Sequence, residues 1–171
     1  MSGENRRIKL VAYSFIITII VSTGFLILNL YDYIGLLNSL KRFDISVAEM
    51  EISPEEDEIL ITLTFTVVNP TAYSRLSLSS LQCQLYLDVD GEEDYIGTIA
   101  YSPPSNEPLR PYEPFSYMMT LSIPKARNQF LSTYGPTSEL QWRVRCVVHF
   151  VTPIRKYYQT MNLYAKSSGH L

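Results

Sequence analysis

One uninterrupted apolar stretch near the amino end limits what this chain can fold into. Between Leu10 and Leu30 there is no Asp, Glu, Lys or Arg, whereas Arg6, Arg7 and Lys9 stand directly before the stretch. About 21 residues at about 1.5 Å of rise per residue cover roughly 30 Å, which is the thickness of the hydrocarbon core of a bilayer. The sequence therefore predicts a single transmembrane helix over this stretch.

The length of the apolar stretch indicates whether the helix is kept in the mature protein, and the residues on either side of it indicate its orientation in the membrane. A cleaved secretory signal has an apolar region of roughly 7–15 residues and a small-residue cleavage site, whereas this stretch is longer and lacks such a site. We therefore expect a permanent anchor. Because basic residues precede it and Tyr31, Asp32 and Tyr33 follow it, the positive-inside rule places the N-terminus in the cytoplasm. The rest of the chain is expected outside the cytoplasm, held at the cell membrane as a single-pass protein.

The residues beyond the span suffice for one domain of about 125 residues. Ile34, Leu37 and Leu40 keep a helical spacing and indicate a helical stalk at 31–43. The first 43 residues hold five of the 14 basic residues and two of the 17 acidic residues, so the outer domain is acidic. We therefore expect no nucleic-acid partner, and a domain that stands off the membrane surface.

After Asp44 apolar and polar residues alternate, which is the period of β-strands. The clearest strand is expected to turn one face inward, formed by Ile59, Ile61, Leu63, Phe65 and Val67. A later strand has the corresponding face Trp142, Val144, Cys146, Val148 and Phe150. Further strands are expected at 81–89, 95–101, 115–123 and 157–164, with a hairpin turn at Asp90-Gly91. Only 125–134 is typical of a short helix.

Roughly seven short strands separated by turn signals are typical of an antiparallel sandwich. We therefore predict a mainly β fold, with a single N-terminal transmembrane helix followed by an immunoglobulin- or fibronectin-III-like β-sandwich that contains one short helix. The predicted divisions are a cytoplasmic tail at 1–9, the transmembrane helix at 10–30, the stalk at 31–43, the sandwich at 44–165 and a tail at 166–171.

Short motifs in the outer domain resemble those of a known family. The residues that carry the resemblance are Asn69-Pro70 at the end of a long strand, Ile96-Gly97 after a hairpin, the loop 111–114, and Pro124 before the short helix. Over about 45–165 the pattern resembles the LEA group-two family, also called the water-stress and hypersensitive-response (WHy) domain. The resemblance implies a β-sandwich without catalytic residues and a role in stress protection.

These motifs also have a direct physical meaning. Pro70 has no N–H with which to extend a strand ladder, and Asn69 can form local hydrogen bonds that shape the turn. Gly97 indicates a bulge or a close approach of another chain segment. The chain departs from the family at 143–146, where many relatives carry a glycine and this sequence has none.

No set of residues in the sequence is typical of catalysis or of cofactor binding. The chain has two histidines, His149 on a strand and His170 at the end, and no Ser/His/Asp set or phosphate loop. We expect a non-enzyme without a cofactor. The acidic run at 88–94 contains alternating carboxylates, but Gly91 stands in the wrong place for a calcium loop, so we expect a solvated turn and no metal.

Cys83 and Cys146 are the two cysteines, and both fall on inward faces of separate strands. In a domain outside the reducing cytoplasm a buried disulfide is one interpretation. Two small core side chains are the other, because sequence alone does not bring the Cα atoms within the ~4.4–6.8 Å that a bridge requires.

The predicted span has one weakly polar face, formed by Ser14, Thr18, Ser22 and Asn29. Residues of this kind let membrane helices approach and hydrogen-bond to one another, so a helix–helix interface is one hypothesis. In a lone helix the same side chains bond to their own backbone instead. Both interpretations stay open.

Two classes of function remain. The first is a membrane-tethered LEA/WHy-like domain that acts as an accessory or interaction subunit or in stress protection, with membrane lipid and other transmembrane proteins as partners and no small-molecule ligand. The alternative is a structural component of a pilin-like surface filament or of its anchoring machinery, because such proteins also join an N-terminal apolar helix to a β-sandwich. A third hypothesis is carbohydrate binding by the tyrosine-rich segment 101–117.

Overall fold

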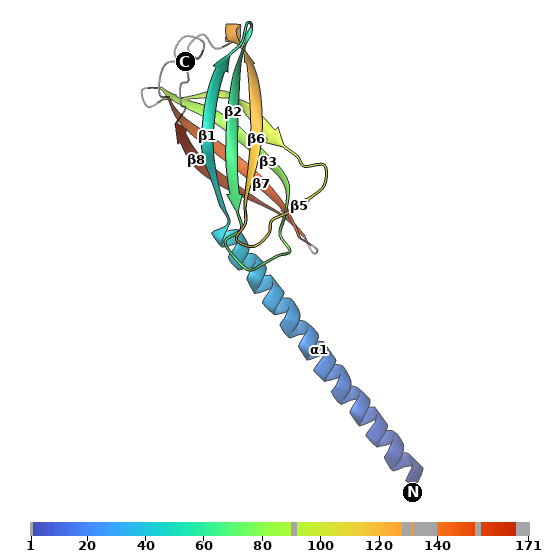
Figure 1. Cartoon of the computed structure of the whole chain (residues 1–171). Coiled ribbons are helices and arrows are strands. Elements are labelled where there is room, and N and C mark those ends of the chain that lie inside the picture. The colour runs from blue at the N-terminus through green and yellow to red at the C-terminus, as the bar shows by residue number, and fades with distance from the viewer. Residues whose placement is uncertain (1, 90–91, 128–130, 132–139, 153–154, 167–171) are drawn as a thin grey trace.

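The computed structural model describes residues 2–89, 92–127, 131, 140–152 and 155–166. A long helix, α1 (Ser2–Arg42), leads into a domain of antiparallel strands (Figure 1). In chain order the domain contains β1 (Asp44–Pro54), β2 (Glu58–Val68), β3 (Ser77–Val89), β4 (Glu92–Tyr101), β5 (Glu107–Pro108), β6 (Pro114–Pro124), the 3-10 turn η1 (Lys125–Arg127), β7 (Gln141–Val151) and β8 (Lys156–Lys166). The predicted mainly β fold with one N-terminal helix is confirmed.

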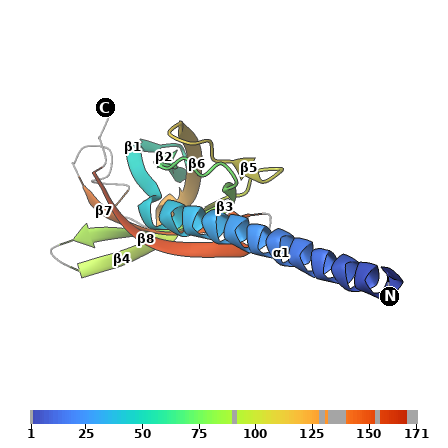
Figure 2. The same cartoon turned by 90° about the horizontal axis from the view of Figure 1, so that it is seen from below.

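The strands form two facing sheets. One sheet has the order β1-β2-β6, and the other has the order β4-β3-β7-β8 with the short β5 beside β3. All of these pairings are antiparallel. Seen from below, β1, β2 and β6 lie in one layer and β4, β7 and β8 in the other (Figure 2). The sheets approach each other along the β4–β6 and β1–β8 sides.

The core lies between the sheets, on the faces that the alternation predicts. Every second residue of β2 from Ile59 to Val67 is buried, and β7 is buried at every second residue from Trp142 to Phe150. Burying a large aliphatic or aromatic side chain stabilises the fold by about 1.5–3 kcal/mol, so these faces supply much of the driving force for folding.

Helix α1 is continuous from Ser2 to Arg42, so the predicted stalk extends the same helix (Figure 1). The residues of the expected cytoplasmic tail at 1–9 are helical from Ser2 on, and their place in the cytoplasm stays a prediction. Every side chain from Ile8 to Tyr31 is exposed, and the most apolar part has a mean hydropathy of 2.3. Within the described residues, α1 is the one helix long and apolar enough to cross a membrane; a signal sequence would have the same property.

Two expectations fall partly outside the described residues. The short helix expected at 125–134 is seen as the turn η1 and the buried Leu131; the rest of it lies outside them. The same holds for the turn at Asp90-Gly91, although the pairing of Val89 with Glu92 joins β3 and β4 as a hairpin. Strand β8 ends at Lys166, one residue beyond the predicted end of the sandwich.

Candidate functional site at the helix–sandwich junction

The last turns of α1, together with Phe43 directly after the helix, are part of the sandwich core. Leu36 and Phe43 are 2% and 4% exposed. The ring of Phe43 meets Phe150 of β7 edge to face, with ring centroids 4.6 Å apart. Buried aromatic pairs of this geometry contribute about 0.5–1.5 kcal/mol beyond their burial. The helix is therefore held by packing against the domain and does not depend on a flexible linker.

A buried amide, the side chain of Asn69, joins the helix to two loops. Its Oδ1 accepts hydrogen bonds from Ser39 Oγ and Thr71 Oγ1, each at 2.8 Å. Its Nδ2 donates to the carbonyl oxygens of Tyr73 at 2.7 Å and Leu109 at 3.3 Å. An amide side chain has two donor hydrogens and two acceptor lone pairs, so this group is fully used. Asn69 thereby connects α1, the β2–β3 loop and the segment after β5.

The sequence predicts the local part of this arrangement. Pro70 ends the strand and Asn69 shapes the turn through Thr71, as expected. The bond to Ser39 is not predicted. The sequence signal for this bond is the spacing of Leu36 and Ser39 at the end of α1, followed by Phe43, which puts one polar residue among the apolar side chains that face the core.

A groove of about 380 Å³ runs between α1 and the loops that Asn69 holds; we call it the junction groove. Its lining includes Tyr31, Asp32, Gly35, Arg42, Tyr73 and Tyr112. The ring of Tyr73 comes close to the helix because Gly35 has no side chain: an added Cβ would lie 3.1 Å from Tyr73 Cδ2. Arg75 Nη1 lies 3.3 Å from Asp32 Oδ1 and forms an ion pair between the loop and the helix.

Two tyrosines of the junction groove, Tyr73 and Tyr112, differ from ordinary surface tyrosines, one in its pKa and the other in its backbone conformation. Burial raises the pKa of Tyr73, and the carboxylate of Asp32 raises it further. Tyr112 has a φ of 61°, in the left-handed region that non-glycine residues rarely adopt. Its backbone N–H donates to the carbonyl oxygen of Asn69 at 2.8 Å, while its side chain is 66% exposed.

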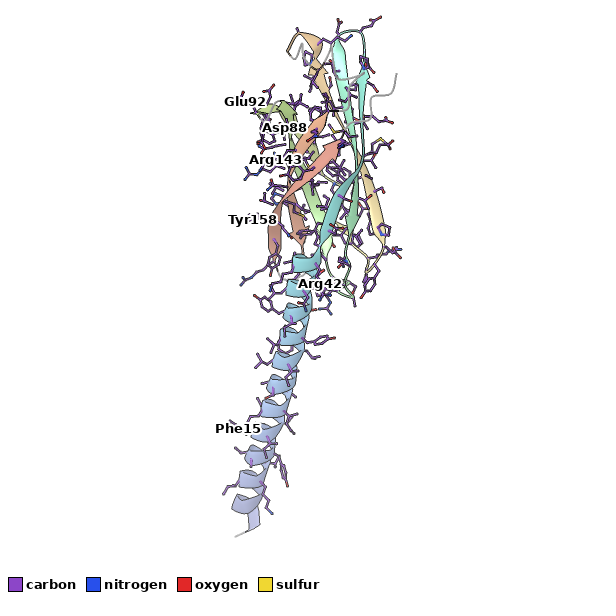
Figure 3. All side chains as sticks on the ribbon, turned by 90° about the vertical axis from the view of Figure 1, so that its left-hand side faces the viewer. Phe15, Arg42, Asp88, Glu92, Arg143 and Tyr158 are labelled. Atoms are coloured by element: carbon purple, nitrogen blue, oxygen red, sulfur yellow. A yellow bond between two sulfur atoms is a disulfide. The ribbon has the colours of Figure 1, made fainter. Side chains whose placement is uncertain are left out.

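A second surface lies on the outer face of the β4-β3-β7-β8 sheet; we call it the tyrosine–arginine face. The cross-strand neighbours that form it are Tyr86, Arg143 and Tyr164 in one row and Gln84, Arg145 and Asn162 in the next. Farther along, His149 lies beside Tyr158, with ring centroids 6.3 Å apart. Figure 3 shows Arg143 and Tyr158 on the same side of the sandwich. Exposed tyrosine and arginine are enriched at protein interfaces.

The two cysteines form a bond in the structure. Cys83 of β3 and Cys146 of β7 are direct cross-strand partners, fully buried, with a sulfur–sulfur distance of 2.17 Å. Of the two interpretations that the sequence left open, the structure has the disulfide. The pairing depends on β3 and β7 being neighbours, which the spacing of the cysteines along the chain does not reveal.

The polar residues of the predicted span bond within their own helix. Thr18 Oγ1 donates to the carbonyl oxygen of Ser14 at 2.9 Å, and Asn29 Nδ2 donates to that of Phe25 at 2.7 Å. Ser22 is exposed on the same face. The helix–helix interface at these positions stays a prediction.

The remaining motif residues have structural roles. A register shift opposite Leu85 leaves Ile96 without a partner in the ladder with β3, so the bulge expected near Gly97 is present. A Cβ on Gly97 would lie 2.7 Å from Leu121 Cδ2, so the expected close approach is present as well. Ile96 is 6% exposed and packs in the core.

The acidic run lies at the far end of the hairpin. Asp88, Glu92, Glu93 and Asp94 are exposed, and Glu93 forms an ion pair with Arg143. Within the described part of the chain, no group of three or more His, Cys, Asp or Glu could hold a metal ion. His149 is exposed on the surface of β7; His170 lies outside the described residues.

The tyrosine-rich segment 101–117 does not form a single exposed platform. Tyr101 and Tyr117 pack on each other with ring centroids 4.8 Å apart, and Tyr117 is 5% exposed. Tyr112 alone of these three presents its ring to solvent, and it does so beside the junction groove.

Comparisons with known proteins show no family. No protein-family model matches the chain, and no curated protein matches it. Among solved structures, AT1g01470 from Arabidopsis thaliana is 12% identical over 71% of this chain and 78% of its own, with a TM-score of 0.47. The putative ApaA protein from Bordetella pertussis is 14% identical over 72% and 90%, with a TM-score of 0.43. A protein from Archaeoglobus fulgidus is 10% identical over 75% and 96%, with a TM-score of 0.39.

Likenesses at this level carry no argument about function. The molecule is a β-sandwich with one long apolar N-terminal helix, and what it does has to be argued from its own residues. The resemblance to the LEA group-two family remains a proposal.

Proposed function

We propose that this chain is a non-enzymatic, single-pass membrane protein that presents its sandwich outside the cytoplasm as an interaction subunit of a membrane assembly. The observation that carries the proposal is the tyrosine–arginine face, on which Arg145, Tyr158 and Tyr164 are exposed, on a domain that packs onto the end of an apolar helix. A domain held in this way presents one sheet in a defined direction relative to the membrane.

Three features support the anchoring and the orientation. The helix is exposed on all sides from Ile8 to Tyr31, as a lipid-facing helix is. Basic residues precede this apolar part, which favours a cytoplasmic N-terminus. A buried disulfide is typical of compartments outside the reducing cytoplasm.

Stress protection, which the family resemblance implies, would then act through the same surface. A folded sandwich protects other molecules by binding them, unlike a disordered chain that acts through its hydration. The tyrosine–arginine face offers planar, hydrogen-bonding side chains suited to such contacts.

The test is co-purification of the full-length chain in a mild detergent, with quantitative mass spectrometry of associated membrane proteins. We expect a stoichiometric partner that is lost in the Arg145→Ala, Tyr164→Ala double variant. The control is Met118→Ala, which removes an exposed side chain from β6 of the opposite sheet and should leave the partner bound. Equal recovery in all three proteins would contradict the proposal.

Electron microscopy of the same sample tests the alternative, a filament component. In a filament the exposed apolar helix would pack against helices of other copies instead of lipid. Regular fibres in place of single particles would favour that alternative over the interaction subunit.

A further inference from the structure

The loop between β2 and β3, residues 69–76, is fixed to α1 at two levels. Farther from the apolar stretch, Ser39 Oγ of the helix donates to Asn69 Oδ1 at 2.8 Å. Nearer to it, Arg75 Nη1 lies 3.3 Å from Asp32 Oδ1. Ser39 and Asp32 are seven residues apart, which is about 10 Å along a helix. The loop therefore follows the helix toward the proposed membrane span.

The contact between Arg75 and Asp32 lies close to the end of that span. A bilayer of about 40–45 Å with a hydrocarbon core of about 30 Å leaves roughly 5–7 Å of headgroup layer on each side. With the core ending at Leu30, the Cα atom of Asp32 is about 3 Å beyond it and that of Gly35 about 7–8 Å. Arg75 thus meets the helix within the headgroup layer, and the ring of Tyr73, which lies against Gly35, is at the outer border of that layer.

The surface of α1 at this level is exposed and partly apolar. Tyr31 is 80% exposed, and Tyr33 and Ile34 are each 49% exposed, so the sandwich leaves these side chains uncovered. Tyrosine is enriched where membrane helices pass through the headgroup layer. These residues place that layer at the level where the loop contacts the helix.

The loop and its contact on the helix are electrically neutral together. Arg75 is the one charged residue within 69–76, and Asp32 pairs with it. A paired charge costs less to remove from water than a free one. The prediction that the acidic domain stands off the membrane rests on its total charge, whereas this neutral loop is not repelled by headgroups of either sign.

We propose that the β2–β3 loop lies in the headgroup layer of the membrane that anchors the chain, so that the sandwich rests on the bilayer through this loop. The partner of the loop is the lipid surface, which exposed Ala72 and Ser74 meet directly, and no particular headgroup charge is needed. Because Asn69 of the same loop is bonded to Ser39, contact with the bilayer also limits the tilt of the sandwich. The inference rests on the proposed membrane anchoring.

The test measures how close three positions of the full-length chain come to lipid headgroups. The single variants are Ser74→Cys in the loop, Tyr33→Cys on the helix and Ser53→Cys on β1, all at exposed positions. Each is labelled with bimane in the absence of reductant, which leaves the buried bond between Cys83 and Cys146 intact. The labelled chains are placed in phosphatidylcholine nanodiscs, with and without lipids that carry a nitroxide on the headgroup as a short-range quencher of fluorescence.

Tyr33 reports the depth of the helix itself, and Ser53 is the matched serine at the other end of the sandwich. Ser53 lies nine residues beyond Asp44, where β1 leaves the helix, and this is about 30 Å along a strand. We expect the labels at Ser74 and Tyr33 to lose most of their fluorescence to the nitroxide lipids and the label at Ser53 to keep nearly all of it. Quenching at Ser74 should be unchanged in about 1 M sodium chloride, where the screening length is about 3 Å, because the contact does not depend on charge.

The other outcomes separate this inference from the proposed function. Quenching at Tyr33 without quenching at Ser74 would overturn the inference and leave the anchoring intact. No quenching at Tyr33, or no entry of the chain into nanodiscs, would show that the anchoring fails and the inference with it. Equal quenching at Ser74 and Ser53 would mean that the sandwich lies flat on the bilayer, and loss of quenching at Ser74 in high salt would mean an electrostatic contact; either result would overturn the proposal.

Discussion

The side chain of Asn69 is fully buried and fully hydrogen-bonded, so its loss should be felt across the junction. Asn69→Ala leaves Ser39 Oγ without its acceptor and two carbonyl oxygens without their donor. We expect a loss of about 2–4 kcal/mol in the free energy of unfolding. Thr71→Ala removes two hydrogen bonds of the hydroxyl, a short one to Asn69 Oδ1 and a long one from the backbone N–H of Tyr73, and should lose about 1 kcal/mol.

Urea unfolding of the full-length chain in detergent provides the measurement. Trp142 is the sole tryptophan and is 1% exposed, so its fluorescence reports the core directly. Equal losses in the two variants would show that Asn69 does not hold the junction as the geometry indicates.

A second expectation at the residue scale is that buried Tyr117 makes the folded state less stable at alkaline pH. Burial raises the pKa of Tyr117, and the nearby carboxylate of Glu107 raises it further. In the unfolded chain the same phenol titrates near the ordinary value of 10.0. Above that pH the unfolded state releases a proton that the folded state keeps, so stability is fully present below about pH 10 and falls as the pH rises beyond it.

We therefore expect Tyr117→Phe to reduce the loss of stability above pH 10. At pH 7 the variant should be unchanged or more stable by about 1 kcal/mol, because the buried hydroxyl has no hydrogen-bond partner among the described residues. Tyr164→Phe, at a position 77% exposed, is the control and should leave the pH profile unaltered. Melting temperatures between pH 7 and pH 11 measure the difference; identical profiles for wild type and Tyr117→Phe would contradict it.

At the scale of elements, the docking of α1 depends on Gly35. A side chain there would press on the ring of Tyr73, whereas nothing lies within 4 Å of a Cβ added to Gly24 of the same helix. We expect Gly35→Leu to destabilise the docked end of α1 by about 1–3 kcal/mol and Gly24→Leu to leave it unchanged.

Hydrogen exchange detects this loss at the backbone amide of Phe43, which donates to the carbonyl oxygen of Ser39 at 2.8 Å. Exchange there should become about tenfold faster, or more, in Gly35→Leu. Equal exchange in the two variants would mean that the helix end tolerates a side chain facing Tyr73.

The disulfide between β3 and β7 is expected to contribute strongly to the stability of the sandwich. Cys83 and Cys146 are 63 residues apart, and closing a loop of this size stabilises a fold by about 4 kcal/mol through the unfolded state. Replacing both with alanine should lower stability by at least that amount, and adding a reductant to the unfolded wild-type chain should have a similar effect. Alkylation without reductant is the control, and labelling of both thiols would contradict the bond.

Charged side chains are distributed unevenly along the length of the whole molecule. The acidic residues of the β1–β2 turn and the β3–β4 hairpin lie at the end of the sandwich opposite the helix, and Figure 3 shows Asp88 and Glu92 far from Phe15. Exposed basic groups, among them Arg42 and Arg75, lie where the helix enters. This arrangement fits a domain that stands upright on a membrane, because its acidic end points away from anionic headgroups.

Truncation tests the division between anchor and domain. A chain of residues 31–171 keeps Leu36, Ser39 and Phe43, so we expect it to be soluble without detergent and to unfold cooperatively. A chain of residues 44–171 lacks these buried groups and should lose several kcal/mol, since each large apolar side chain contributes about 1.5–3 kcal/mol. Size-exclusion chromatography and Trp142 fluorescence measure both; equal stability of the two truncated chains would contradict the docking.

Local periodicity made much of the architecture predictable. The apolar stretch from Leu10 to Leu30 and the alternation in β2 and β7 depend only on the spacing of side chains along a regular backbone. For that reason the helix, the inward faces and the bulge near Gly97 follow from the sequence. The residues of the predicted tail at 1–9 are also helical from Ser2 on, because helical structure continues through polar residues once a long helix has formed.

The candidate functional surfaces depend on contacts between distant parts of the chain. Ser39 reaches Asn69 across 30 residues, and Cys83 reaches Cys146 across 63. The tyrosine–arginine face exists because β3, β7 and β8 are neighbours in one sheet. The sequence by itself thus determined an apolar helix and a sandwich, since those patterns are local. Only the tertiary structure decided the junction groove, the disulfide and the exposed face, because strand order and helix docking set which distant side chains meet.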